Sequence, residues 1–384
     1  MTKDWSAIIL AGGKGTRLMP LTSEVPKPLV PVTNVCMVDY AIAHLIYAGI
    51  DHIILALAYM GEKLQDYINE TWTEEKLGDV RLDTHIQDSK GTADAYRLLR
   101  DDLDSENVVV SMADIVTNLP MRDFMDFHEE KGGIATISMK PVESHTSQYG
   151  VVQLDSDRKI HLFLEKPGPM ELYVSSMSQQ EDIYMHTNII NTGIYCFKNE
   201  VGEVLMDNPN IMDFGGELFP YFLDNQFDLY GFVRDYYWLD CGNPQTYLWA
   251  NWDLLRKYAW PITPNGQEYD GIFVMGVINS GSDVTIEKPT CFGEYVYLDD
   301  GVRVKQLSSV GNKVNVGKRT LIQKSVIWDR VEIGSGCKIS DSIISNDCEV
   351  GDDVVLEKAI IAPKCKVSDG THLRDETLEL GEQV

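Results

Sequence analysis

The sequence predicts an α/β domain with a mostly parallel sheet, followed by a parallel β-helix built from six-residue repeats. Strand-like and helical segments alternate in the first part of the chain, which is typical of a parallel sheet with helices on both faces. In the last part, large apolar residues recur at every sixth position, the period of a coil with flat sides. Pro261 and Pro264 indicate a linker, so the expected domains are residues 1–257 and 258–384.

The elements expected in the first part follow from apolar runs and from helical spacing. Strands are predicted at 6–11, 53–58, 108–114, 134–139, 149–152, 163–167 and 191–197, and a further strand end at 237–244. Helices are predicted at 36–48, 61–70 and 245–257, and Gly49 ends the first of them. Residues 168–187 are polar and have no clear period, so a surface loop or an insertion is predicted there.

The six-residue period of the last part begins at Ile286 and keeps one register as far as Ile322. It then slips by one residue three times before the end of the chain. The segments 325–327, 342–344 and 359–361 recur every seventeen residues. Valines and isoleucines scattered through ordinary strands would not hold one register through seven hexamers, so a parallel β-helix is the prediction.

The composition of the 384-residue chain excludes several classes of protein. Hydrophobic residues make up 44%, which is ordinary for a folded chain. No apolar run reaches the length of a membrane span, and the first residues lead into a strand without a signal-peptide pattern. The formal net charge of −26 repels nucleic acid and anionic lipid. We therefore expect no nucleic-acid partner and no membrane partner.

The seven cysteines are scattered and form no C-x-x-C pair. This spacing argues against both a zinc site and a disulfide framework. A reduced, cytoplasmic protein is therefore the expectation.

A glycine-rich turn after the first expected strand is a candidate phosphate site. It runs from Gly12 to Arg17, and Lys27 follows between two prolines. Glycines let backbone N–H groups approach phosphates closely, Arg17 offers a planar fork for phosphate oxygens, and Lys27 offers a point charge. The turn matches neither common phosphate fingerprint, so a tight strand-to-helix turn with surface cations is the alternative. We favour a site for a triphosphate.

Two carboxylates, Asp114 and Asp240, stand at the ends of expected strands. Ligands of open parallel sheets bind at the carboxyl ends of strands, where the glycine-rich turn also falls. Mg²⁺ prefers one or two carboxylates together with phosphate oxygens and waters. Either aspartate alone would more often be a turn or cap residue. Together with the glycine-rich turn and the downstream motifs described next, the two aspartates predict a magnesium site.

A longer pattern indicates a family. Three motifs follow one another: Gly12-Gly13-Lys14-Gly15-Thr16-Arg17-Leu18, Pro20-Leu21-Thr22 and Pro26-Lys27-Pro28-Leu29-Val30-Pro31. Together they resemble the signature of the nucleoside-diphosphate-sugar pyrophosphorylases, or sugar-1-phosphate nucleotidylyltransferases. The resemblance extends over essentially the whole chain. It implies a Rossmann-like nucleotidyltransferase domain followed by a left-handed β-helix of hexapeptide repeats.

The resemblance also implies a reaction, in which a sugar-1-phosphate attacks the α-phosphorus of a nucleoside triphosphate and releases pyrophosphate. The implied cofactor is Mg²⁺. The implied catalytic residues are Arg17, Lys27 and Asp114, and the implied metal ligands are Asp114 and Asp240. The implied nucleotide-binding residues are Leu10, Ala11, Gly12, Gly13, Gly15, Thr16, Gln87, Gly91 and Thr92. The implied sugar-phosphate-binding residues are Tyr149, Gly150, Glu165, Lys166, Asn191 and Thr192.

The chain departs from the family pattern at three places. Ala113 precedes Asp114 where the family usually has glycine, which leaves the ligand intact. Gln87 lies one position nearer to Gly91 than in the common pattern, which leaves the identity of the base open. Residues 34–37 are Asn-Val-Cys-Met, where relatives often have Asn-Lys-Pro-Met.

Several functions stay open. Two-domain relatives are often mannose-1-phosphate guanylyltransferases, and glucose-1-phosphate uridylyl-, thymidylyl- and adenylyltransferases are alternatives. A coil domain that also transfers acetyl groups would need a general base, and its only histidine, His372, lies near the last turn. A non-catalytic regulatory subunit is disfavoured, because the cations and carboxylates named above are retained.

The coil predicts an assembly as well. Stacked coils expose unpaired backbone edges and apolar interior at their ends, which something must cover. Tyr295, Tyr297, Val326 and Trp328 are expected on the broad sides, where they would form an apolar contact face. We therefore expect a homo-oligomer, either a dimer or a tetramer made of two dimers.

Overall fold

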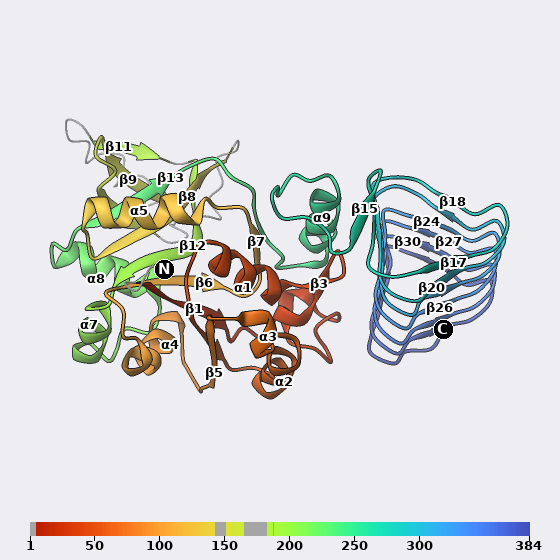
Figure 1. Cartoon of the computed structure of the whole chain (residues 1–384), viewed down its shortest axis with the longest axis horizontal. Helices are drawn as coiled ribbons and strands as arrows, with labels where there is room; N and C mark the ends of the chain where they lie inside the picture. Colours follow the sequence, from red (N-terminus) through yellow and green to blue (C-terminus); the bar gives the residue numbers. More distant parts are fainter. Residues whose placement is uncertain (1–4, 143–150, 165–182, 187) are drawn as a thin grey trace. The chain divides into compact units, whose positions relative to one another are not determined.

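The computed structural model describes residues 5–142, 151–164, 183–186 and 188–384 (Figure 1). The chain folds into two compact units. Unit 1 comprises Met1–Gly13, Ala41–Ala113 and Leu119–Trp238, and unit 2 comprises Lys14–Tyr40, Asp114–Asn118 and Leu239–Val384. Unit 2 thus combines the C-terminal coils with two short segments from the first third of the chain. The domain boundary expected between residues 257 and 258 stays a prediction.

Unit 1 is built on a seven-stranded sheet with the order β13-β8-β12-β6-β1-β4-β5. Its strands are β1 (Trp5–Ala11), β4 (His52–Leu57), β5 (Arg81–Ile86), β6 (Asn107–Met112), β8 (Ala135–Pro141), β12 (Ile189–Lys198) and β13 (Leu229–Val233). All neighbouring pairs run parallel except the two that β12 makes with β6 and β8. Both β1 and β4 are buried at every position, as expected for a sheet covered on both faces. The predicted mostly parallel sheet is confirmed.

Helices connect these strands. Unit 1 contains α2 (Gly61–Thr71), α3 (Glu74–Leu77), α4 (Thr92–Leu99), α5 (Met121–Lys131), α7 (Val201–Asp207) and α8 (Phe219–Asp224), with the short helical turns η3 (Arg100–Asp102) and η4 (Phe214–Leu218). Helix α1 (Met37–Tyr47) ends just before Gly49, whose φ of +89° suits a residue without a Cβ atom. The helices predicted at 36–48 and 61–70 are confirmed. Within the described ranges, no helix has the length and apolar character needed to cross a bilayer.

A second sheet in unit 1 has three strands in the order β10-β9-β11. The strands β9 (Val151–Asp155) and β10 (Ile160–Leu164) overlap the strands expected at 149–152 and 163–167, and the rest of those two ranges, 149–150 and 165–167, lies outside the described residues. The strand β11 (Ile183–His186) corrects the prediction of a loop at 168–187, because its backbone pairs antiparallel with β9. A four-residue edge strand gives too short a pattern for periodicity to detect. The rest of that stretch, 168–182 and 187, lies outside the described residues.

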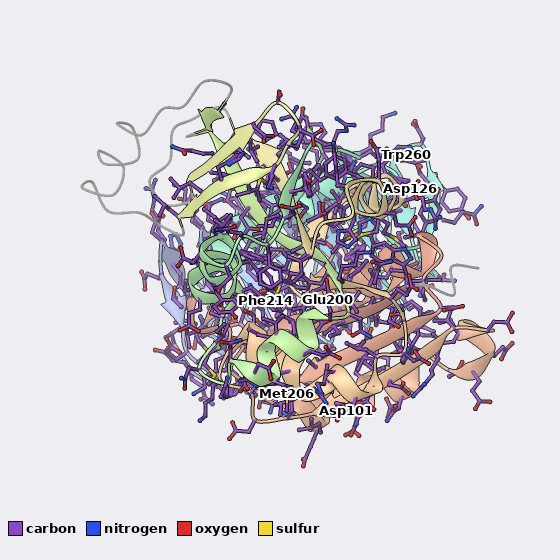
Figure 2. The ribbon with its side chains drawn as sticks, turned by 90° about the vertical axis from the view of Figure 1, so that its left-hand side faces the viewer. Asp101, Asp126, Glu200, Met206, Phe214 and Trp260 are labelled. Carbon is purple, nitrogen blue, oxygen red and sulfur yellow. The ribbon has the colours of Figure 1, made fainter. Side chains whose placement is uncertain are left out.

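An aromatic cluster packs η4 and α8 against β12. The ring of Phe214 lies 5.1 Å from that of Phe197 and 5.5 Å from that of Tyr195, measured between centroids. Figure 2 labels Phe214, together with Glu200 and Met206 at the two ends of α7. The cluster holds the segment around η4 in place, and this segment contacts one of the predicted binding loops.

The C-terminal part of unit 2 is a parallel β-helix, in which successive coils stack and their strands form three sheets (Figure 1). Coil sheet 1 contains β15 (Gln267–Tyr269), β16 (Ile272–Val274), β19 (Thr290–Phe292), β22 (Ser308–Val310), β25 (Val326–Ile327), β28 (Ile343–Ile344), β31 (Ile360–Ile361) and β34 (Thr377–Leu378). Coil sheet 2 contains β17 (Ile278–Ser280), β20 (Val296–Leu298), β23 (Asn315–Val316), β26 (Glu332–Ile333), β29 (Glu349–Val350) and β32 (Lys366–Val367). Coil sheet 3 contains β18 (Thr285–Ile286), β21 (Arg303–Val304), β24 (Leu321–Gln323), β27 (Lys338–Ser340), β30 (Val355–Glu357) and β33 (His372–Arg374).

The register of these strands explains the slips in the hexapeptide period. Cys291 pairs with Ser309, eighteen residues later, whereas Ser309 pairs with Val326, seventeen residues later. The following coils of sheet 1 keep the shorter step. Each slip is therefore one residue removed from a coil, and the apolar interior stays in register. Its column Val310, Ile327, Ile344 and Ile361 is completely buried. The predicted β-helix is confirmed.

Other parts of unit 2 contact the middle of coil sheet 1, where Asn34 donates to the Val310 carbonyl and Trp328 donates to Tyr247. Val326 and Trp328 are only 3% and 2% exposed, which corrects their assignment to a free contact face. Periodicity shows that such side chains point outward, but it does not show what covers them. Tyr295 and Tyr297 are exposed, as expected.

The remaining elements of unit 2 precede the coils in the sequence. They are η1 (Thr16–Leu18), η2 (Lys27–Leu29), β2 (Pro31–Val32), β3 (Val35–Cys36), β7 (Ile115–Thr117), β14 (Trp238–Asp240) and α9 (Pro244–Leu255). The helix predicted at 245–257 corresponds to α9.

Candidate active site

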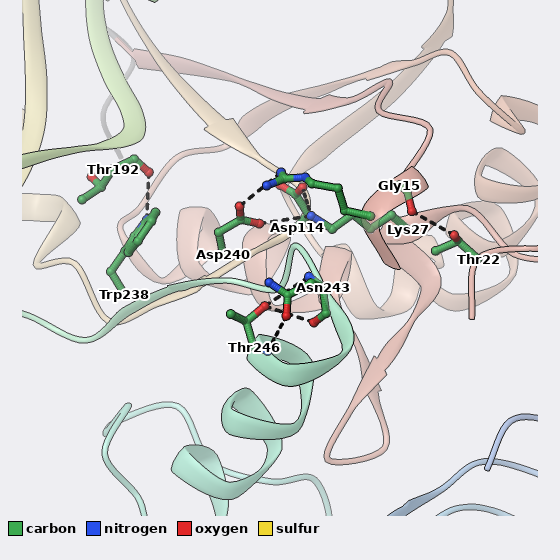
Figure 3. A network of polar contacts seen from close by, with 10 residues as sticks. Gly15, Thr22, Lys27, Asp114, Thr192, Trp238, Asp240, Asn243 and Thr246 are labelled. Carbon is green, nitrogen blue, oxygen red and sulfur yellow. Dashed lines mark hydrogen bonds and ion pairs between the residues drawn. The ribbon is translucent and has the colours of Figure 1, made fainter. Parts of the chain in front are cut away.

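Lys27 lies between the two aspartates that the sequence singled out (Figure 3). Its Nζ donates to Asp114 Oδ2 at 2.5 Å and to Asp240 Oδ1 at 3.1 Å. The Lys27 side chain is 8% exposed, whereas those of Asp114 and Asp240 are 32% and 37% exposed. The ammonium is therefore buried, and the carboxylates keep oxygen atoms accessible to a ligand.

Strand pairing brings the two aspartates together. Asp114 directly precedes β7, and Asp240 is the last residue of β14; these strands form a two-stranded sheet. Beyond the strand end, the Cys241 N–H donates to the Asp114 carbonyl at 3.4 Å. The carboxylates thus meet through backbone pairing, although they are far apart in the sequence.

Two prolines hold Lys27 in its place. Pro26 and Pro28 flank it, and η2 begins at Lys27, whose carbonyl accepts from the Val30 N–H at 3.0 Å. Proline fixes φ and removes a backbone donor, so this segment has few alternative conformations. Burial lowers the pKa of the Lys27 ammonium, but the charges and hydrogen bonds of Asp114 and Asp240 outweigh burial and raise it. Lys27 therefore stays charged at neutral pH.

The end of the glycine-rich turn lies beside Lys27. Gly15 has a φ of +62°, and a Cβ there would lie 3.1 Å from the Cβ of Lys27. The Thr22 hydroxyl donates to the Gly15 carbonyl at 3.1 Å and fixes the turn. Arg17 Nη2 lies 3.7 Å from Asp240 Oδ2, and its side chain is 76% exposed. A side chain that is so open to solvent can reorient toward an anionic ligand.

The start of α9 holds the segment that follows Asp240. The Asn243 side chain accepts from the Gln245 and Thr246 N–H groups, and Thr246 reciprocates in a capping box. A Cβ on Gly242 would lie 3.0 Å from Asp240 Oδ2, so the absent side chain leaves that oxygen room. Our sequence analysis missed this support, although asparagine before proline is a recognisable helix start.

The two carboxylates suit a hard divalent cation whose other ligands are phosphate oxygens and waters. Two carboxylates converge here, and no cluster of three or more His, Cys, Asp or Glu side chains able to hold a metal occurs among the described residues. Mg²⁺ is commonly bound through one or two carboxylates, with phosphate oxygens and waters completing the shell. The two aspartates fit that arrangement.

The other predicted nucleotide-binding residues lie at the end of β1, in the turn that follows it and in the segment 87–92. Leu10 and Ala11 are the buried end of β1, and Gly12 and Gly13 are exposed directly after it in unit 1. Thr16 is exposed in unit 2. These surface positions are compatible with backbone contacts to a ligand, and their predicted roles stay predictions.

The predicted base-binding loop, at 87–92, is fastened to the segment before η4. Gly91 has an extended backbone, and a Cβ there would lie 2.2 Å from the Met212 carbonyl oxygen. The Thr92 hydroxyl donates to Asp213 at 3.0 Å. Gln87 donates its side-chain amide to the Ala95 carbonyl at 3.3 Å. The close approach of Met212 thus explains why residue 91 is a glycine. The same contacts hold the loop that would face the base.

The predicted sugar-phosphate residues are described only in part. Tyr149, Gly150, Glu165 and Lys166 lie outside the described residues. Asn191 accepts from the Gly193 N–H at 2.9 Å and donates to Tyr195 at 3.0 Å.

Thr192 is completely buried, and its hydroxyl contacts Ser138 and Tyr236. Its carbonyl accepts from the Trp238 indole at 2.8 Å (Figure 3). The Thr192 side chain therefore takes part in internal packing, and its predicted contact with a ligand stays a prediction.

Comparison with known proteins identifies the class. The nucleotidyl transferase family matches residues 6–257, and the EIF2B subunit epsilon LbH domain, a β-helix, matches residues 271–379. The chain belongs to the nucleotidyl transferase family. The resemblance found in the sequence, and the left-handed β-helix that it implied, are thereby confirmed.

Relatives are named as sugar-1-phosphate nucleotidyltransferases. The chain is 28% identical to a UTP–glucose-1-phosphate uridylyltransferase of Synechocystis, over 84% of this chain and 82% of that one. It is 30% identical to mannose-1-phosphate guanylyltransferase 1 of Arabidopsis thaliana, over 84% and 85%. It is 34% identical to mannose-1-phosphate guanyltransferase beta-A of Xenopus laevis, over 63% of this chain and 62% of that relative. The enzyme class predicted from the sequence is supported by all three names.

Proposed function

We propose that the protein transfers a nucleotidyl group from a nucleoside triphosphate to a sugar-1-phosphate and releases pyrophosphate. The observation that carries this proposal is the Lys27 ammonium, held at 2.5 Å and 3.1 Å between Asp114 and Asp240. A phosphoryl-type transfer needs cations placed around phosphate oxygens and carboxylates that bind a divalent ion. This arrangement supplies both.

In the proposed reaction, a phosphate oxygen of the sugar-1-phosphate attacks the α-phosphorus of the triphosphate. The bond from that phosphorus to the oxygen bridging it to the β-phosphorus breaks, and pyrophosphate leaves. Arg17 binds the triphosphate, and Lys27 stabilises the charge that develops in the transition state. Mg²⁺, bound by Asp114 and Asp240, would neutralise further phosphate charge when present.

We propose GTP and mannose-1-phosphate as the substrates, following the guanylyltransferases among the relatives. The uridylyltransferase of Synechocystis makes UTP with glucose-1-phosphate the first alternative. The phosphate-binding residues do not distinguish these pairs, because the phosphates are common to all of them.

The decisive experiment is a panel of nucleoside triphosphates against several sugar-1-phosphates, with pyrophosphate release measured with and without Mg²⁺. We expect the highest kcat/KM for GTP with mannose-1-phosphate and no release without the metal ion. A different preferred pair would overturn the substrate assignment alone. No release with any pair would favour a non-catalytic subunit and overturn the proposal. Acetyl-CoA consumption would show a second activity.

We also propose a homo-oligomer in a reducing, cytoplasmic setting. None of the seven cysteines, all of which lie in the described ranges, forms a disulfide, and most are buried, as suits a protein that does not rely on disulfides. Tyr295 and Tyr297 leave aromatic surface exposed on the coil. Sedimentation at micromolar concentration should give a dimer or a tetramer, and replacing both tyrosines by serine should shift it toward monomer. A monomeric wild-type protein would contradict this proposal.

A further inference from the structure

Trp328 stands out on the outer face of coil sheet 1. The strand register places Gly311 and Ser345 at the same position of the neighbouring coils. A Cβ on Gly311 would lie 2.7 Å from the backbone carbonyl carbon of Trp328, so the coil needs a glycine beside it. Trp328 is nevertheless 2% exposed, because its indole packs edge-on against Tyr247 of α9. One large side chain among small neighbours thus reaches out of the coil into the rest of unit 2.

Trp328 and Tyr247 form a hydrogen-bond relay with a fixed direction. The Trp328 indole N–H donates to the Tyr247 hydroxyl at 2.8 Å. That hydroxyl donates its own proton to the Pro31 carbonyl at 2.5 Å. An indole nitrogen can only donate, so the tyrosine must accept from Trp328 and donate to Pro31. Burial raises the pKa of Tyr247 far above its usual range, which keeps this proton in place.

The relay ends four residues after Lys27. The turn η2 connects Lys27 to Pro31, where β2 begins. The strands β2 and β3 pair antiparallel and form a hairpin that begins at Pro31. One turn further along α9, Asn251 accepts from the Thr33 N–H of this hairpin at 2.7 Å.

The cap residue of helix α9, Asn243, also lies three residues after Asp240. The same helix therefore anchors the aspartate and the lysine segment that contacts it. The distance of 3.1 Å between Lys27 Nζ and Asp240 Oδ1 therefore depends on the position of α9.

We propose that Trp328 is a positioning residue for the transfer reaction: through Tyr247 it fixes the Pro31 carbonyl, and thereby keeps the Lys27 ammonium between Asp114 and Asp240. This inference rests on the proposed function, and it deepens it by giving the β-helix a part in turnover. A buried hydrogen bond that is lost leaves the tyrosine free to shift, and the lysine segment can shift with it.

The test uses the full-length protein and three single variants. Trp328→Phe keeps an aromatic ring and removes the N–H donor, and Tyr247→Phe removes the hydroxyl. Trp249→Phe is the matched control, because Trp249 lies on the same helix with a side chain 46% exposed. A misplaced reacting group costs rate more than binding, so both relay variants should lower kcat about tenfold with little change in KM. The control should match wild type.

A double variant and a labelling experiment complete the test. If Trp328 acts through Tyr247, the double variant should be no slower than Tyr247→Phe alone. An amine-reactive reagent, followed by mass spectrometry, should label Lys27 about tenfold faster in Trp328→Phe than in wild type or in Trp249→Phe, since the lysine is buried only while its segment is held.

Unchanged kcat and unchanged Lys27 labelling in Trp328→Phe, with a lower melting temperature, would overturn the inference and leave Trp328 a packing residue. Additive losses in the double variant would overturn it too. A wild-type protein without any transfer activity would refute the proposed function instead. In that case, the labelling rates alone still decide whether Trp328 positions Lys27.

Discussion

Replacing Lys27 by methionine tests the centre of the candidate site. Asp114 Oδ2 and Asp240 Oδ1 lie 2.5 Å and 3.1 Å from Nζ, so they are at most 5.6 Å apart, the sum of the two distances. The two like charges repel at that separation by about 0.7 kcal/mol in water and about 3 kcal/mol at an effective dielectric constant of 20, and without the ammonium no attraction offsets this repulsion. Both carboxylates are about one-third exposed, so the loss of unfolding free energy should fall between these values, at about 1–2 kcal/mol.

Turnover of the Lys27→Met variant should fall much more than its stability. Removing one preorganised group that stabilises transition-state charge commonly lowers kcat by about 10²–10³. Pyrophosphate release measures this loss, and thermal unfolding measures stability. Mg²⁺ should raise the melting temperature of the variant more than that of wild type, because two carboxylates no longer neutralised by lysine bind a divalent cation better.

The matched control is Lys338→Met, which removes an exposed lysine from coil sheet 3 and should change neither measurement. If Lys27→Met kept wild-type turnover and the same response to Mg²⁺, the assignment of Lys27 and of both aspartates would be wrong. A variant that is inactive but shows no differential response to Mg²⁺ would refute the metal site and leave the role of the lysine standing.

Three further predictions concern other parts of the site and the core. Asp114→Asn and Asp240→Asn should each lose most activity while folding normally, and near-normal turnover at limiting Mg²⁺ would rule out that residue as a ligand. Arg17→Ala should chiefly lower kcat, whereas Lys166→Ala should chiefly raise KM for the sugar phosphate; swapped kinetics would reverse the two assignments. Burial, with the charge of Lys198, lowers the pKa of His128 from 6.5 to about 3. Between these two pH values the unfolded chain binds more protons than the folded one. The free energy of unfolding should therefore fall as the pH drops below about 6.5, by up to about 1.4 kcal/mol per pH unit. In His128→Gln, urea unfolding should lose that part of the pH dependence, and an unchanged pH profile would contradict it.

Much of the fold follows from short-range patterns in the sequence. Apolar runs predict the buried strands of unit 1, because a strand covered on both faces has no polar side. The hexapeptide period predicts the coils, because each repeat must send one side chain inward. β11 escaped prediction, since four residues on a sheet edge carry no distinct period.

The candidate site was predictable as a set of residue types, but its geometry was not. Asp114 and Asp240 stand out as carboxylates at strand ends. Their meeting point depends on the pairing of β7 with β14, two three-residue strands whose register no local pattern reveals. The burial of Trp328 was hidden for a similar reason, because its partner lies on a helix 81 residues earlier in the chain.

Unit 2 is built from segments that lie far apart in the sequence, and this affects the order in which the chain folds. Glu24 pairs with Lys364 at 2.5 Å, a contact that joins residues 340 positions apart. Closing a loop of that size costs about 5 kcal/mol of chain entropy by the logarithmic law for flexible loops. At about 5–20 residues per second, the ribosome needs about 17–70 s to synthesise the intervening chain. The segment that carries Lys27 therefore gains this contact with the coils only after residue 364 has been synthesised.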